Sequence, residues 1–169
     1  KHVYGARRVF ICGPVAGVLD LVSDNIAVDG VVPLSGPFDS DYVVGSMSLP
    51  WLVDIEQSKI TGRPYFFAEA ADIPRRGRLN VGLVWRGNPA YGQDVHRSMA
   101  FSEFCPLFDL PNVAFYSLQA GPAGLEVTNT GFDGFVANLE PLASTWRDTA
   151  RLIQALDVVV TVDTAVAHL

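Results

Sequence analysis

Several features are scarce in this sequence, and each scarcity argues against a class of protein. Cysteine occurs twice, at Cys12 and Cys105, without metal-type spacing or a signal-peptide pattern, so we expect two buried free thiols and a cytoplasmic setting. The apolar runs, such as DVVVTV, are far shorter than the roughly 20 residues of a membrane helix, so no transmembrane segment is expected. Lys and Arg total 12 against 18 Asp and Glu, which argues against nucleic acid as a partner.

What the sequence does contain is typical of a folded α/β protein. Hydrophobic residues make up 49% and charged residues 18%, enough apolar material for a core. In the first half, the patterns predict a strand within 7–13, a helix within 15–22, a strand within 29–34 and a third strand at Tyr42–Val44. Strands alternating with helices indicate parallel sheets.

The same alternation restarts after a segment rich in Pro, Gly and Arg. Residues 71–78 are therefore predicted to be a linker with solvated arginines, between a first domain at 1–70 and a second at 79–169. The second domain is predicted to contain a buried strand, a polar loop, a helix, a strand, a short element, an amphipathic helix and a last strand. These lie at 79–85, 87–98, 101–108, 112–118, 134–139, 144–157 and 158–162.

The last segment, LDVVVTVDTAVAHL, carries the first functional indication. The valine-rich run 158–162 predicts a strand covered on both faces, and Asp163 and Thr164 are residue types that cap helices. A helix that begins at the carboxyl end of a parallel strand favours a phosphate, and His168, four residues after Thr164, could add a donor. A capped helix with a partly buried histidine is the alternative. Because the strand has no following helix to cover it, we expect these 169 residues alone to be poorly stable.

Three predicted strands of the second domain end in polar or glycine-rich loops, namely RGNPAYGQ, QAGPAG and VDTAVAH. In open α/β sheets ligands bind beyond the carboxyl ends of the strands, so these loops predict one shared site for a phosphorylated ligand. Asp94 and His96 directly follow RGNPAYGQ, in the same predicted polar loop. They are interpreted either as an acid–base pair or as solvated loop residues.

The motifs VGLVWRGNPAYGQDVHRSM, FYSLQAGP and DTARLIQALDVVVTVDTAVAHL occur in this order. With them, the chain resembles the glycosyltransferase domain of bacterial tetratricopeptide-repeat proteins. That domain is similar to the heptosyltransferases of glycosyltransferase family nine. The resemblance covers 79–169 well and 7–67 more loosely. It implies a GT-B fold, with two Rossmann-like domains that are each partly represented here, so that the sequence is expected to be an internal fragment.

The resemblance also implies roles for particular residues. Asp163, Thr164 and His168 match the DT-x-x-x-H motif that lies by the donor's diphosphate, and Arg97 matches a basic residue that could stabilise the leaving group. The family pattern further assigns donor contacts to the loop and turn residues Gly87, Asn88 and Gln119. No metal ligand and no cofactor are expected. The expected function is transfer of a sugar from a nucleotide-diphosphate sugar to a glycan, lipid or protein acceptor, with tetratricopeptide repeats as a possible neighbour in the same polypeptide.

Two other functions stay open at this point. Ala120 stands where many relatives have a basic or bulkier residue, and the segment that carries the relatives' proposed acceptor base has no counterpart in this sequence. Both departures suit a non-catalytic nucleotide-sugar-binding or protein-interaction module. An epimerase of the same architecture is a third possibility, because it also cleaves the bond to a nucleoside diphosphate.

Overall fold

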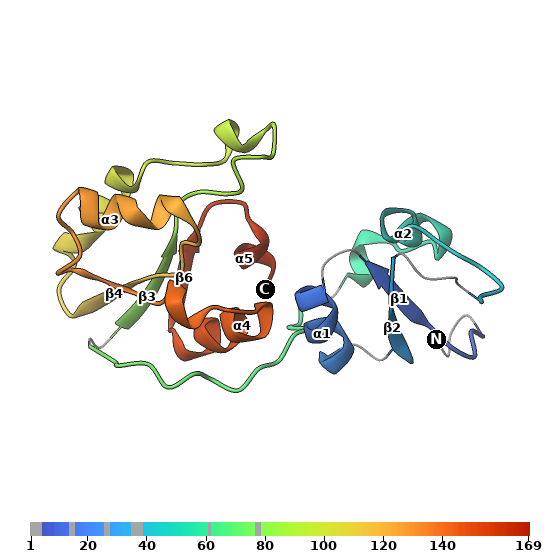
Figure 1. Cartoon of the computed structure of the whole chain (residues 1–169). Coiled ribbons are helices and arrows are strands. Elements are labelled where there is room, and N and C mark those ends of the chain that lie inside the picture. Colours follow the sequence, from blue (N-terminus) through green and yellow to red (C-terminus); the bar gives the residue numbers. More distant parts are fainter. Residues whose placement is uncertain (1–4, 14–15, 26–27, 35–38, 61, 77–78) are drawn as a thin grey trace. The chain divides into compact units, whose positions relative to one another are not determined.

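The computed structural model describes residues 5–13, 16–25, 28–34, 39–60, 62–76 and 79–169 (Figure 1). The chain divides into two compact units, unit 1 at Lys1–Phe66 and unit 2 at Phe67–Leu169. Both units combine helices with parallel strands, so the predicted α/β class is confirmed.

Unit 1 contains a small parallel sheet. Strand β1 (Phe10–Gly13) and strand β2 (Gly30–Pro33) pair side by side and are joined through helix α1 (Ala16–Asn25), as the sequence predicts. Leu21 and Val22 of α1 are buried. The remaining elements are short: 3-10 helix η1 (Ser46–Ser48), helix α2 (Leu49–Leu52) and 3-10 helix η2 (Gln57–Lys59).

Two predictions for unit 1 are wrong. Tyr42–Val44 is not a strand, and Tyr42 is 90% exposed. Apolar β-branched residues favour a strand only where a neighbouring strand can accept their hydrogen bonds, and the described residues place none beside this segment. Cys12, expected to be buried, is exposed on β1, and Cys105 of unit 2 is only half-buried; both thiols are free.

Unit 2 is built on a four-stranded parallel sheet with the order β5-β4-β3-β6. The register pairs Val81 with both Phe115 and Val158, which places the first strand of the unit at the centre of the sheet. The strands are β3 (Leu79–Val84), β4 (Val113–Ser117), β5 (Val136–Asn138) and β6 (Val158–Thr161). The helices are α3 (Leu125–Asn129), α4 (Trp146–Ala155) and α5 (Ala165–His168). The 3-10 helices are η3 (Asp94–His96), η4 (Phe101–Asp109), η5 (Pro122–Gly124) and η6 (Glu140–Leu142).

Both faces of this sheet are packed, because strand residues alternate between them. On one face, Leu152 and Ala155 of α4 pack against Tyr116 and Leu118. On the other face, Phe101 and other aromatic residues of η4 join Val127 of α3 against the sheet. Figure 1 shows α4 and α3 on opposite sides of the strands. This layered arrangement is compatible with a Rossmann-like fold.

The segment predicted as a linker packs on unit 2 where the structure describes it. Ile73 is 6% exposed and belongs to the core beneath α4. The backbone N–H of Ala71 donates to the carbonyl of Arg151 at 2.9 Å. Arg75, expected to be solvated, donates to both carboxylate oxygens of Asp157 at 2.8 Å. These contacts hold the described part of the segment against the rest of unit 2. Residues 77–78 lie outside the described residues.

Two further details of unit 2 differ from expectation. Strand β6 is an edge of the described sheet, and Val158 and Val160 are 45% and 38% exposed, so the prediction that both faces are covered is wrong. The helix predicted at 101–108 is a 3-10 helix that contains Pro106, whose ring nitrogen cannot donate a helical hydrogen bond. Within the described ranges, every helix is too short or too polar to cross a membrane.

Candidate functional site

The strand order of unit 2 identifies one place for a ligand. From the central strand β3 the chain continues outward through β4 and β5, and then returns to place β6 on the other side of β3. In open α/β sheets, ligands bind outside the carboxyl ends of the strands at such a reversal of strand order. Here the two loops are 85–100, after β3, and 162–164, after β6. Of the predicted site residues, Gly87, Asn88, Arg97, Asp163 and Thr164 lie on these loops, whereas Gln119 follows β4 and His168 belongs to α5.

Arg97 joins the two loops. Its Nη1 donates to the backbone carbonyl of Asp163 at 2.8 Å, across 66 residues of sequence. Its Nε donates to the carboxylate of Asp94 at 2.9 Å, and its guanidinium carbon lies 4.8 Å from the centre of the Tyr91 ring. A guanidinium has five N–H donors, so these two hydrogen bonds leave three for another acceptor.

Asp94 and Ser98 form the hydrogen-bond network that holds Arg97. The Ser98 hydroxyl donates to the Asp94 carboxylate at 2.7 Å and accepts from the backbone N–H of Gly87 at 2.9 Å. The hydrogen bond from Ser98 lowers the pKa of Asp94, burial opposes this, and the hydrogen bond and charge of Arg97 lower it further. The carboxylate is therefore ionised at neutral pH. Asp94 is 9% exposed, and the interpretation of this residue as solvated is wrong.

Gly87 allows the close approach of these groups. A Cβ atom at this position would lie 2.2 Å from the Asp94 carboxylate and 2.6 Å from Nη2 of Arg97. Only a residue without a side chain fits there while the ion pair keeps its place. The neighbouring Asn88 is exposed, and its side-chain oxygen accepts from the backbone N–H of Ala90 at 3.0 Å, which stabilises the turn.

Gln119, another predicted site residue, is buried at 4% exposure. Its side-chain oxygen accepts from the backbone N–H groups of Trp85 and Arg86, at 3.0 and 2.9 Å. Its amide nitrogen donates to the carbonyls of Arg86 and Ala120, at 3.2 and 3.1 Å. All four hydrogen-bonding positions of the amide are therefore used within the protein. Gln119 fixes the start of the loop after β3.

The segment after β6 is more exposed. Thr164 occupies the N-cap position of α5, as predicted, but its hydroxyl lies 3.3 Å from the hydroxyl of Thr161 and makes no capping bond. His168 Nε2 lies 3.5 Å from the carboxylate of Asp163, with both side chains about three-quarters exposed. The structure thus brings Arg97 to the backbone of Asp163, while the side chains of Asp163 and His168 point to solvent beside each other.

An ion pair at the start of the loop after β3 was not predicted. Arg86 pairs with Glu126 of α3, whose second oxygen accepts from the backbone N–H of Phe101 at 3.0 Å. Burial acts to raise the pKa of Glu126, but the hydrogen bonds from Arg86 and Phe101 outweigh it, so the pKa is lowered.

The network around Arg97 was also missed, although a sequence pattern does indicate part of it. Asp94, Arg97 and Ser98 have the i, i+3, i+4 spacing of neighbours on one turn.

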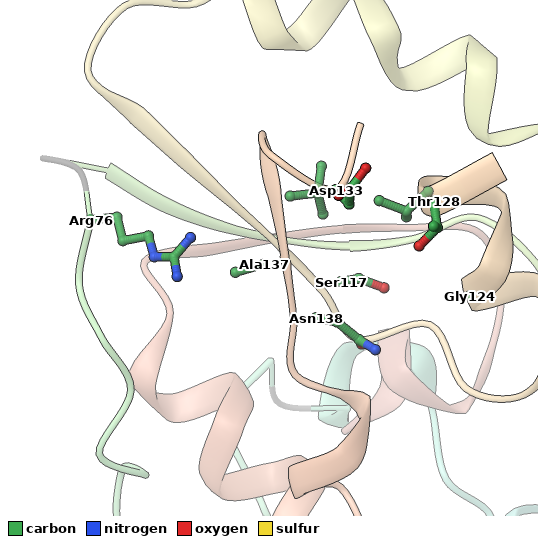
Figure 2. A pocket seen from close by; sticks show the side chains of 9 residues that line it. Arg76, Ser117, Gly124, Thr128, Asp133, Ala137 and Asn138 are labelled. Atoms are coloured by element: carbon green, nitrogen blue, oxygen red, sulfur yellow. The ribbon is translucent and has the colours of Figure 1, made fainter. Parts of the chain in front are cut away.

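A separate pocket of about 310 Å³ lies beside β4 and β5 (Figure 2). Its polar lining includes Ser117 and Asn138, which are register partners at the ends of these strands, and Thr128, Asp133 and Arg76. Arg97 and Asp163 do not line this pocket. Ser117 links it to the site, because its hydroxyl accepts from the backbone N–H of Gln119 at 3.2 Å.

Comparisons with protein-family models, curated proteins and solved structures find no match. Among the described residues, no group of three or more His, Cys, Asp or Glu side chains is placed to hold a metal ion. Function is therefore inferred from the geometry around Arg97 and from the resemblance of the sequence motifs.

Proposed function

We propose that the loops after β3 and β6 bind the diphosphate of a nucleotide sugar, and that the chain belongs to a metal-independent glycosyltransferase of GT-B architecture. One observation carries this proposal. Arg97 links the two loops at the strand-order reversal through its 2.8 Å bond to Asp163 and keeps three N–H donors for a ligand. Arginine donors are well suited to phosphate oxygens because several can engage one phosphate group.

The proposed reaction transfers the sugar from the diphosphate to an acceptor hydroxyl of a glycan, lipid or protein. The bond between the anomeric carbon and the diphosphate oxygen breaks, and both electrons leave with the nucleoside diphosphate. The acceptor oxygen forms the new bond and loses its proton to a base outside the described site. Arg97 would stabilise the charge that develops on the leaving oxygen, while the Gln119 contacts keep the loop in place.

Calorimetric titration of the purified protein with UDP, GDP, ADP and their sugar conjugates tests the binding step. We expect Arg97→Ala to lower the affinity for the nucleotide that the wild type binds by about 10- to 100-fold, which is the range for hydrogen bonds to a charged group. Arg75→Ala is the matched control, because it removes an arginine that pairs with Asp157 at the amino ends of the strands. Equal affinity of the wild type and Arg97→Ala would refute the proposal.

A non-catalytic nucleotide-sugar-binding module is the second candidate. The residues placed around Arg97 suit binding, and Ala120 offers no additional phosphate contact from the turn after β4. A product assay on the same protein separates the candidates: sugar transfer supports the enzyme, binding without transfer supports the module, and inversion of a sugar centre without transfer supports an epimerase. A protein-interaction role would leave all nucleotides unbound.

A further inference from the structure

The ion pair between Asp94 and Arg97 keeps two charged groups mostly buried, where a charge without a partner is energetically unfavourable. The side chain of Asp94 is 12% exposed, and that of Arg97 is 25% exposed. Removing charged groups from water is unfavourable unless they are paired and hydrogen-bonded. Asp94 meets this condition through Arg97 and Ser98, with no other side chain completing its shell among the described contacts.

The backbone reinforces the same geometry. The carbonyl of Asp94 accepts from the N–H groups of Arg97 and Ser98, at 3.1 and 2.8 Å, so the three residues form one tight turn. One carboxylate oxygen of Asp94 bonds the guanidinium and the other bonds the hydroxyl. The guanidinium lies against Gly87 and 4.8 Å from the centre of the Tyr91 ring.

We propose that Asp94 is the positioning residue for Arg97 and fixes the orientation in which the guanidinium faces the phosphate. This inference rests on the proposed function for its ligand. A free arginine side chain samples many rotamers, which must be restricted each time it binds a phosphate. Asp94 restricts them in advance, while three N–H donors of the guanidinium stay unused.

Two measurements on Asp94→Asn test the proposal. Asparagine keeps the shape of the side chain but removes its charge. In ¹H–¹⁵N spectra of the unliganded protein, we expect the Nε–H signal of Arg97, assigned by its loss in Arg97→Lys, to shift and to exchange faster with water. For the nucleotide that the wild type binds among UDP, GDP and ADP, we expect affinity to fall about tenfold, within the range for one charge-assisted hydrogen bond.

The controls separate positioning from folding. Asp157→Asn changes a carboxylate that also accepts from an arginine side chain but lies at the amino ends of the strands, and should change neither the Arg97 signal nor the affinity. In an Arg97→Lys background, Asp94→Asn should have no further effect on affinity, because coupled residues are not additive. An unchanged Arg97 signal, or fully additive losses of affinity, would overturn the proposal. A shifted signal in a protein that binds none of the nucleotides would support the positioning of Arg97 and refute the proposed function.

Discussion

In unit 1, the paired strands β1 and β2 keep most of their residues half-exposed, and the large apolar side chains of 42–55 lie largely in solvent, with Met47 at 93% exposure. In unit 2, β3 and β4 are buried along almost their whole length between two apolar clusters. Apolar composition alone therefore does not determine burial. A strand is buried where chain order supplies neighbours on both sides and helices on both faces, as it does for β3.

Replacing a core aromatic residue in unit 2 should give the largest effect. Phe101 is fully buried and packs on Trp85 with 4.9 Å between ring centres, so Phe101→Ala is expected to cost about 3–5 kcal/mol of unfolding free energy. Trp51→Ala in unit 1 removes a larger side chain that is 81% exposed, and should change stability little. Urea unfolding followed by circular dichroism measures both. A comparable loss of unfolding free energy for Trp51→Ala would contradict the contrast between the two units.

The glycines of the loop after β3 allow a second comparison within unit 2. Gly87→Ala is expected to cost about 1–3 kcal/mol and to displace the ion pair of Asp94 and Arg97, since the new methyl group overlaps both. Gly92→Ala, in the same loop, meets no atom within 4 Å and serves as the control. Thermal unfolding and nucleotide titration of both variants measure the difference. Similar behaviour of the two would show that the loop can adjust around Gly87.

Helix capping distinguishes the units at a smaller scale. Thr145 and Asp148 form a capping box at the start of α4, in which each side chain bonds the backbone N–H of the other residue. Thr145→Ala should cost about 1 kcal/mol. Ser48 occupies the equivalent position of α2 in unit 1 but makes no capping bond, so Ser48→Ala should leave stability unchanged. Thermal melts in which Ser48→Ala is the more harmful change would contradict this assignment.

The last expected effect is a pH dependence that belongs to unit 2. Hydrogen bonds from the side chain and the backbone of Asn80, and then from Arg75, lower the pKa of Asp157 from 3.8 to about 2. The unfolded state then binds the proton more readily, so this stabilisation is complete above about pH 4 and is lost as pH falls to about 2. The melting temperatures of the wild type and Asp157→Asn should therefore converge over that range. A constant difference would show that Asp157 does not titrate there.

The sequence predicted most of unit 2 but less of its site. Valine-rich runs such as 158–162 identified the strands, and the amphipathic pattern identified α4, because both signals are local. Pairing partners are not local, which is why Tyr42–Val44 was mistaken for a strand. The bond from Arg97 to the carbonyl of Asp163 is not local either, because it spans 66 residues of sequence.

The position of β6 beside β3 also has a consequence for the order in which the molecule forms. Strands β3, β4 and β5 can pair in sequence as they leave the ribosome, but β6 must close a long loop back to the first strand. Arg97 is synthesised 66 residues before its carbonyl partner. We therefore expect the link between the loops after β3 and β6 to form only after β3, β4 and β5 have paired, so that a chain released before residue 163 would contain a paired sheet without the carbonyl that Arg97 bonds.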